Sequence, residues 1–512
     1  MKNFKYIFIA TIFLYTASCS NFEEINTNPD KSTSVPPEML AAYTMMKTFK
    51  LSNNSPDVFT QITLFNHHVT KLASSPDPNQ YYWSYYPYSS FGNFKYLTDL
   101  HDMVEFSNGS PAEPSYRGLE LFMKAWYGFK ATVELGDIPY SEAGMASEGI
   151  SQPKYDKQAD VFAQILDDLQ EAESYFAQGF DFNGDIMYNG DASKWRKLCN
   201  ALQLKVIQTM SKKATADQKA RFAAIVNAGN LMTSYDDDLK LVYTENTNAT
   251  YPFYNGNNQR LDEAPSTLAV EALKMNNDYR LFYFAEPAQA EIDGGLTETD
   301  FDAYIGAPYW EDANTLSINN DAGMYSNLNQ RYVQFPDNDP LLYFTYAEQC
   351  FIIAEAIEEG WVSGDAQTYY EDGVKAQLSY YMNLPHTAGL VHSMEITQTY
   401  IDSYFTGDAA YKTAGSKEDR LKQIWMQRWL IDFFQPNSSY YPQFLRTGYP
   451  DYVLDPVTSL NEDNTSEFPK RWKYLTTGNN SELTTNPVNY QNAIDSQYSG
   501  VDNTMGVPWY LQ

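Results

Sequence analysis

Apolar residues recur with the period of an α-helix in several separated segments, and this pattern most constrains the fold. Their side chains fall three or four positions apart, which places them on one helix face. Gly136 and Gly360 stand where the first and last of these helices should end. Asp191 or Ser193 should cap the start of the third. The segments are Phe122–Val133, Phe162–Phe176, Trp195–Val206 and Ala347–Ile357, and they predict a mainly α-helical protein.

The expected helices come in pairs, near residues 117–176, 194–230 and 342–381. They resemble the helix-turn-helix units of tetratricopeptide arrays, although no strict repeat period survives. Residues 236–340 and 434–512 are rich in Asn, Asp, Gly, Pro and Tyr and show little periodicity. We expect long ordered loops and short strands there, draped over a helical scaffold. Loops held on a rigid scaffold are where binding usually takes place.

The first 18 residues are typical of a secretory signal peptide. Lys2 and Lys5 precede an apolar run over residues 6–15 that is too short to span a bilayer, and Thr-Ala-Ser follows before Cys19. Small residues before a cysteine fit a lipobox, so we expect a lipid on Cys19 and a membrane anchor of acyl chains. A plain signal peptide cut nearby is the alternative. Since no later stretch has the length of a membrane span, residues 19–512 should be soluble, and their length allows one large or several small domains.

The charge and the cysteines exclude several classes of protein. The net charge of −30 is not interrupted by a basic cluster, which argues against nucleic acid and against an anionic membrane surface as partners. Cys199 and Cys350 each lie within an apolar helical pattern. We therefore expect two buried thiols and neither a disulfide framework nor a metal site.

The motifs of ordinary enzymes are missing. The sequence has no Gly-rich phosphate loop, no Gly-x-Ser-x-Gly elbow and no His-Glu-x-x-His, and its five histidines are scattered apart from His67-His68. The stretch Asp181–Asp185 begins like a calcium loop, but Ile186 and Ala192 stand where a glycine and a glutamate are needed, so a turn leading into a helix cap is expected. No cofactor or metal is predicted. Paired carboxylates for glycoside hydrolysis stay open, because 65 acidic residues contain many pairs.

Two aromatic clusters are candidates for a binding surface. Residues Tyr81–Tyr88 hold six aromatic side chains in eight positions. A helix could bury only half of them, so the others should lie at a surface, unless both faces pack between neighbouring loops. The second cluster is Tyr304, Tyr309 and Trp310, near the polar Asn319, Asn320 and Asp321. Its alternative is an ordinary turn with a packed tryptophan. We expect the ligand to rest on Tyr82, Trp83 and Tyr86, with Tyr309 or Trp310 opposite.

Six blocks in order along the chain resemble the SusD/RagB family of outer-membrane nutrient-binding lipoproteins, in particular its second SusD-like branch. The family's acidic, Asn-Pro-containing mature start is matched by Asn21–Pro29, and the remaining blocks are Arg117–Ala125 with Leu135–Tyr140, Asp185–Trp195, Tyr346–Ala356, Gln427–Trp429 with Arg446–Pro450, and Phe468–Trp472 with Asn489-Tyr490. The resemblance covers nearly the whole length of the chain. These blocks belong to the scaffold of the family.

The resemblance implies a single domain over residues 19–512, in which four tetratricopeptide-like helix pairs support an irregular ligand-binding half, and it implies no catalysis. It further implies a lipid-anchored, surface-exposed protein of the outer membrane. Such a protein binds oligo- or polysaccharide, or in some cases peptide, and delivers it to a SusC-like TonB-dependent barrel. A secreted helical glycoside hydrolase or lyase is the alternative, and a purely structural helical scaffold is a third interpretation.

Overall fold

The computed structural model describes residues 35–50, 65–72, 88–89, 91–246, 249–254, 263–435, 440–478 and 481–512. The expected signal peptide and Cys19 lie outside these residues. No helix in the described part of the chain is long and apolar enough to cross a membrane. A continuous apolar core runs from Ala41 to Tyr510, so that residues from both ends of the described chain share one interior.

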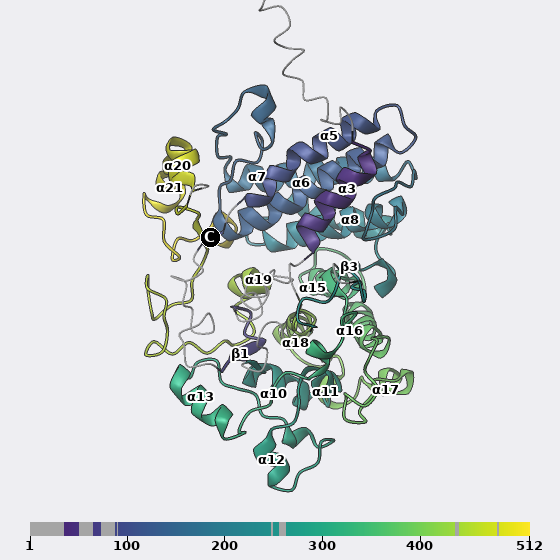
Figure 1. Cartoon of the computed structure of the whole chain (residues 1–512), viewed down its shortest axis with the longest axis vertical. Coiled ribbons are helices and arrows are strands. Elements are labelled where there is room, and N and C mark those ends of the chain that lie inside the picture. Colours follow the sequence, from purple (N-terminus) through teal and green to yellow (C-terminus); the bar gives the residue numbers. More distant parts are fainter. Residues whose placement is uncertain are drawn as a thin grey trace, which may run out of the picture.

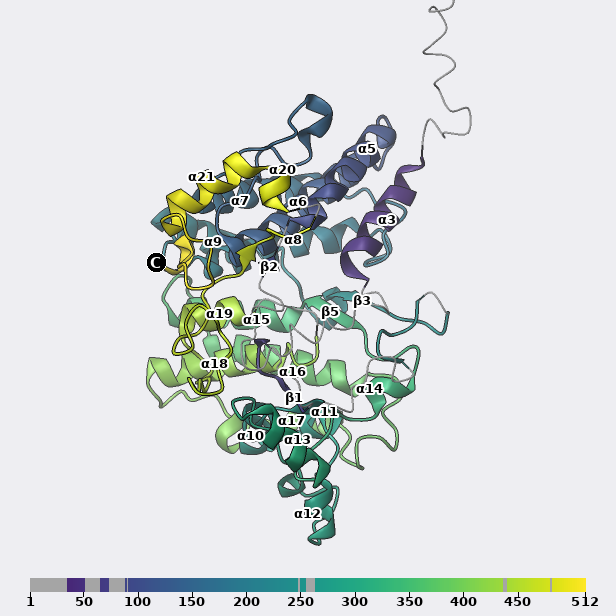
Figure 2. The same cartoon turned by 60° about the vertical axis from the view of Figure 1, so that its left-hand side comes forward.

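Helices dominate the described structure (Figures 1 and 2). The longer ones are α3 (Pro37–Phe49), α5 (Leu97–Ser107), α6 (Glu113–Leu135), α7 (Gln158–Phe176), α8 (Ala192–Thr209), α9 (Ala216–Ala228), α15 (Tyr346–Glu358), α16 (Ala366–Met382), α18 (Lys417–Leu430), α19 (Tyr440–Thr447) and α21 (Pro487–Tyr498). The shorter ones are α10 (Thr267–Met275), α11 (Arg280–Phe284), α12 (Gln289–Asp293), α13 (Ala313–Asp321), α14 (Arg331–Gln334), α17 (Gln398–Ser403) and α20 (Glu482–Thr485). The mainly helical fold class is confirmed.

The helices are stacked along the long axis of the molecule in three groups (Figures 1 and 2). One end holds α3 and α5–α9, with α20 and α21 laid against them. The middle holds α15, α16, α18 and α19, and α8 packs directly against α15. The other end holds α10–α14 and α17, with α12 farthest out. The last group is the irregular part of the chain, and the first two form the helical scaffold.

The four helices with the clearest apolar period are confirmed, as are their caps. The predicted segments lie within α6, α7, α8 and α15. Gly136 ends α6 at a φ of 104°, in the region that only glycine adopts without strain. Asp191 caps α8, where its carboxylate accepts the backbone N–H groups of Ser193 and Lys194. Cys199 and Cys350 are free, buried thiols, as predicted.

Parts of the segments predicted as loops are helical. Residues 236–340 contain the five short helices α10–α14, and residues 434–512 contain α19, α20 and α21. Except for α21, which has 12 residues, these helices have four to nine residues and are too short to show a clear period, and tertiary packing stabilises them more than their own propensity does. Residues 342–344, predicted as the start of a helical pair, belong instead to a buried strand, and the helix begins at Tyr346 behind the cap Thr345.

Three two-stranded sheets connect distant parts of the chain. The strands are β1 (Val69–Lys71), β2 (Tyr88–Ser89), β3 (Leu239–Leu241), β4 (Glu263–Pro265), β5 (Leu341–Phe344) and β6 (Lys473–Tyr474). β1 pairs antiparallel with β4, β2 parallel with β6, and β3 antiparallel with β5. The registers place Thr70 opposite Ala264 and Tyr88 opposite Lys473.

The turn after α6 holds the C-terminal segment against the N-terminal helices. The hydroxyl of Tyr498 donates to the carbonyl of Leu135 at 2.8 Å, and the Asp137 N–H donates to the side chain of Gln497 at 2.8 Å. A Cβ at Gly136 would lie 2.2 Å from the Gln497 side chain, so this position requires glycine for space as well as for its φ. The Leu135–Tyr140 block is therefore a structural junction.

Candidate functional site

The first aromatic cluster connects two strands, but the candidate residues Tyr82, Trp83 and Tyr86 lie outside the described residues. The described chain stops at Leu72, just after β1, and resumes at Tyr88 in β2. The nearest described residues on either side of the intervening stretch belong to or adjoin the β1–β4 pairing and the β2–β6 pairing. Their role in binding stays a prediction.

Tyr309 of the second cluster is buried, with 1% of its side-chain surface exposed. Its ring stacks on His67, with centroids 3.8 Å apart and an interplanar angle of 10°, and its hydroxyl accepts the Val453 N–H at 2.8 Å. The expectation that Tyr309 offers a ring face to a ligand is therefore wrong, because His67 and the loop at Val453 take up its surface. Tyr304 is fully buried as well, and its hydroxyl donates to the Glu298 carbonyl.

Trp310 is the member of the second cluster that keeps exposed surface. It is half-buried and contacts Tyr309 edge to face, with centroids 5.0 Å apart. Its carbonyl accepts the Thr458 hydroxyl at 2.7 Å, which holds the loop of residues 451–459 beside it. In that loop Val457 is 90% exposed and Val453 is 42% exposed. We call Trp310 and this adjoining loop, with its two exposed valines, the Trp310 patch.

The polar residues expected beside Trp310 lie farther away. Asn320 and Asp321 are at the far end of α13, whose start is capped by Asp312. A helix rises about 1.5 Å per residue, so Asn320 lies about 12 Å along the axis from this cap. Asn319 donates its side-chain N–H to the Tyr325 hydroxyl at 2.9 Å and serves the fold. Asn319, Asn320 and Asp321 therefore stand at the other end of α13 from Trp310.

Hydrogen bonds place the Trp310 patch near the start of the first aromatic segment. The Thr70 hydroxyl in β1 donates to the Ala307 carbonyl at 2.8 Å, and the Ala307 N–H donates to the Pro265 carbonyl in β4 at 2.9 Å. Leu72 packs in the same small apolar cluster as Ala307. Leu72, the last described residue before the aromatic segment, thus lies two residues after Thr70, whose hydrogen-bond partner Ala307 lies three residues before Trp310.

His67 and His68 contact aromatic rings in this region, Tyr309 and Trp429 respectively, and the sequence did not predict these contacts. Both side chains are fully buried, and the His68 ring nitrogen Nε2 lies 2.7 Å from the Trp429 carbonyl. Burial lowers the pKa of His67 well below its ordinary value and that of His68 to about 3. Both rings are therefore neutral at physiological pH. The adjacent pair of histidines in the sequence was the signal by which these two residues could have been singled out, but their position alone did not show which aromatic rings they contact.

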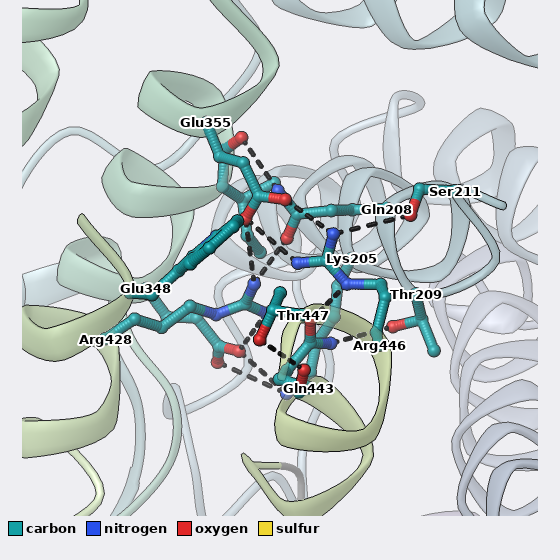
Figure 3. A network of polar contacts seen from close by, with 12 residues as sticks. Lys205, Gln208, Thr209, Ser211, Glu348, Glu355, Arg428, Gln443, Arg446 and Thr447 are labelled. Carbon is teal, nitrogen blue, oxygen red and sulfur yellow. Dashed lines mark hydrogen bonds and ion pairs between the residues drawn. The ribbon is translucent and has the colours of Figure 1, made fainter. Parts of the chain in front are cut away.

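Two of the six resemblance blocks, Tyr346–Ala356 and Gln427–Trp429 with Arg446–Pro450, meet in a buried network of charges between α8, α15, α18 and α19 (Figure 3). The Glu348 carboxylate pairs with Lys205 and with Arg428, at 3.0 Å each. Glu355 accepts a hydrogen bond from Arg446 at 2.6 Å. These side chains are at most 7% exposed and are satisfied by one another, which is the condition for burying charge. The blocks around them are scaffold, as expected.

The turn before α8 is a cap and has no calcium-loop geometry. The Asp185 carboxylate accepts the backbone N–H groups of Met187 and Gly190 and the indole N–H of Trp195, all within 2.9 Å. Its oxygens are thereby used within the fold, which confirms the interpretation as a turn. Across the described residues, no group of three or more His, Cys, Asp and Glu side chains is placed to hold a metal ion.

These features define a mainly helical scaffold whose irregular end carries loops and, among the residues that the structure describes, the half-buried Trp310. The family model described as "starch-binding associating with outer membrane" matches residues 29–475. The chain therefore belongs to the SusD-like family of nutrient-binding outer-membrane proteins.

Solved structures agree with this assignment. A SusD homologue from Bacteroides fragilis is 33% identical and superposes with a TM-score of 0.86, covering 93% of this chain and 100% of its own. A second SusD homologue from the same species is 29% identical, with a TM-score of 0.81 and coverages of 94% and 100%. A chitin-binding protein at 24% identity shares the fold, with a TM-score of 0.70 and coverages of 93% and 99%. No curated protein matches the chain significantly.

Proposed function

We propose that the protein binds oligo- or polysaccharide at the cell surface and delivers it to a SusC-like TonB-dependent transporter. A lipid on Cys19 would anchor it to the outer membrane. The family membership supports binding and association with the outer membrane. We infer the location of the site from the half-buried Trp310. Three residues before it, the Ala307 carbonyl accepts a hydrogen bond from Thr70 in β1, the strand that precedes the aromatic segment around Trp83.

Trp310 and Trp83 would bind a sugar by stacking, because aromatic faces pack on the C–H surfaces of sugar rings. Tyr82 and Tyr86 are the further members of this proposed site, and peptide is the second ligand class to test. A shallow site of this kind should bind with micromolar to millimolar Kd. The loss of one ring worth about 1 to 2 kcal/mol should weaken binding about five- to thirtyfold.

Affinity electrophoresis with a series of polysaccharides tests this proposal. A gel that contains a bound polysaccharide should retard the wild type. Trp310→Ala and Trp83→Ala should each lose this retardation, with Tm changed by no more than a degree or two. Trp361→Ala is the matched control, since Trp361 is also half-buried but packs on Phe222 of α9. Binding that survives both Ala variants, together with a large fall in Tm, would show that these rings belong to the core.

Product analysis of the same incubations separates binding from catalysis. A binding protein leaves the polysaccharide intact, whereas a glycoside hydrolase or lyase releases new reducing or unsaturated ends. If the purified protein releases such ends, and controls exclude a contaminating enzyme as their source, the proposal of a binding protein is overturned in favour of an enzyme.

The anchor and the partner are tested in cells. Metabolic labelling should place an acyl chain on the wild type, and Cys19→Ala should release the protein from membranes. Gentle solubilisation of induced cells should recover a large outer-membrane barrel with the wild type. Absence of the acyl chain, or of any barrel, would count against the corresponding part of the proposal.

A further inference from the structure

A strap of residues 383–397 joins α16 to α17 and lies across the irregular end of the molecule. Val391 in its centre is fully buried. The Leu390 carbonyl accepts the side-chain N–H of Asn329 at 2.7 Å, and the Ile396 N–H donates to the Tyr283 hydroxyl at 3.0 Å. The strap also contains two of the five histidines of the chain, His386 and His392.

His392 bridges two carboxylates. Its Nε2 lies 3.0 Å from Glu286 and its Nδ1 lies 3.3 Å from Glu298. A neutral imidazole has a single N–H and can donate to only one of them, whereas the imidazolium can donate to both. The His392 side chain is 10% exposed. Burial opposes its charge, but the two neighbouring carboxylates of Glu286 and Glu298 outweigh burial and raise the pKa of His392 above its ordinary value.

His386 makes a comparable contact near the other end of the strap. Its Nε2 lies 2.8 Å from Asp337, and its ring stacks on Phe335 with centroids 4.1 Å apart. Both histidines have a positive φ, 55° at His386 and 53° at His392. This backbone conformation is costly for a residue with a side chain, so the side-chain contacts must hold it.

The two carboxylates that His392 bridges belong to a protruding lobe, residues 286–304, which contains α12. Figures 1 and 2 show α12 at the end of the molecule opposite α3 and α5. Within the described residues, the other charged or titratable groups near these contacts are the Tyr304 hydroxyl, close to both glutamates, and Arg331 and Glu395, both close to Tyr283. No lysine or arginine is seen to pair with Glu286 or Glu298 in that part of the chain.

We propose that the strap is a pH-dependent latch that holds the lobe of residues 286–304 to the body of the protein. The latch is closed when His392 is protonated between Glu286 and Glu298 and loosens when it loses its proton, while His386 attaches the strap to Asp337. A histidine whose pKa is raised by folding stabilises the contact fully below the ordinary value of 6.5. That stabilisation is lost as the pH rises through the higher pKa of the folded state. This inference concerns the free protein and does not depend on the proposed function.

Hydrogen exchange of the ligand-free protein, followed by mass spectrometry at pH 6.0 and pH 9.0, tests the latch. After correction for the intrinsic exchange rate, peptides from residues 286–304 should be protected roughly tenfold less at pH 9.0, because charge-assisted hydrogen bonds are lost. Peptides from α6 and α7 should keep their protection. Equal protection of the lobe at both pH values would overturn the proposal.

Variants assign the effect to the strap. His392→Gln, which cannot donate to both carboxylates, should expose the lobe at pH 6.0 and abolish its pH dependence. His101→Gln is the matched control, since His101 also pairs with a glutamate, Glu120 at 3.4 Å, but is 70% exposed and lies on α5. If His392→Gln folds poorly, Glu298→Gln removes one contact at a carboxylate that is 65% exposed. A lobe that keeps its pH dependence in both of these variants contradicts the latch.

Discussion

The buried His68 should make the stability of the protein depend on pH in a way that can be calculated. Its pKa is about 3 in the folded state and 6.5 ordinarily, so the unfolded chain binds this proton far more readily. The contribution of neutral His68 to stability is complete above pH 6.5 and is lost progressively as the pH falls toward 3. From pH 7.5 to pH 5.0 the shift predicts a loss of about 2 kcal/mol in the free energy of unfolding.

Comparison with a variant isolates this contribution from other titrating groups. Burial raises the pKa of Asp238 to about 7, and this carboxyl acts in the opposite direction, because it stabilises the folded state as the pH falls. His68→Gln keeps an N–H for the Trp429 carbonyl but cannot be protonated. Urea unfolding at both pH values should show wild type losing about 2 kcal/mol more than His68→Gln. His101→Gln, at an exposed site, should behave as wild type. A difference below about 0.5 kcal/mol would refute the reasoning.

Three further changes test the scaffold. Glu348→Gln should lower the free energy of unfolding by about 3 to 5 kcal/mol in urea titrations, because two buried cations lose their partner. Its control is Glu418→Gln, in a surface ion pair, which should lower the free energy of unfolding by less than about 1 kcal/mol. Gly128→Ala should lower stability by about 1 to 3 kcal/mol, since the new Cβ would lie 2.2 Å from the Tyr140 ring; an unchanged Tm would mean that the ring can move. Both cysteines are buried with raised pKa values, so a disulfide reagent should label them only after unfolding.

The scaffold could be predicted from the sequence because its signals are local. The period of apolar residues in α6 and the glycine at its end both act within a few turns, and the structure reproduces them. The strand at Leu342 was missed because its apolar residues continue directly into α15, and only pairing with β3 distinguishes the two. The short helices α10–α14 were missed for a related reason, since packing from outside each helix stabilises them.

The candidate site could be predicted only in part because burial at a loop depends on distant residues. Tyr309 and Trp310 are neighbours of similar chemistry, yet one is core and the other is half-buried. The difference comes from His67 and Val453, which lie more than a hundred positions away along the chain on either side of Tyr309. No local pattern carries that information.

The junction at the end of α6 also sets when the protein can finish folding. The Tyr498 hydroxyl reaches the Leu135 carbonyl across 363 positions, and the Tyr510 N–H reaches the Gln158 side chain across 352. At synthesis rates of about 5 to 20 residues per second, the C-terminal partner leaves the ribosome about 20 to 70 seconds after the N-terminal one. During that interval the α6–α7 pair can form its local contacts but not its final packing. The nascent chain therefore stays incompletely folded until Tyr498 and Tyr510 have been made.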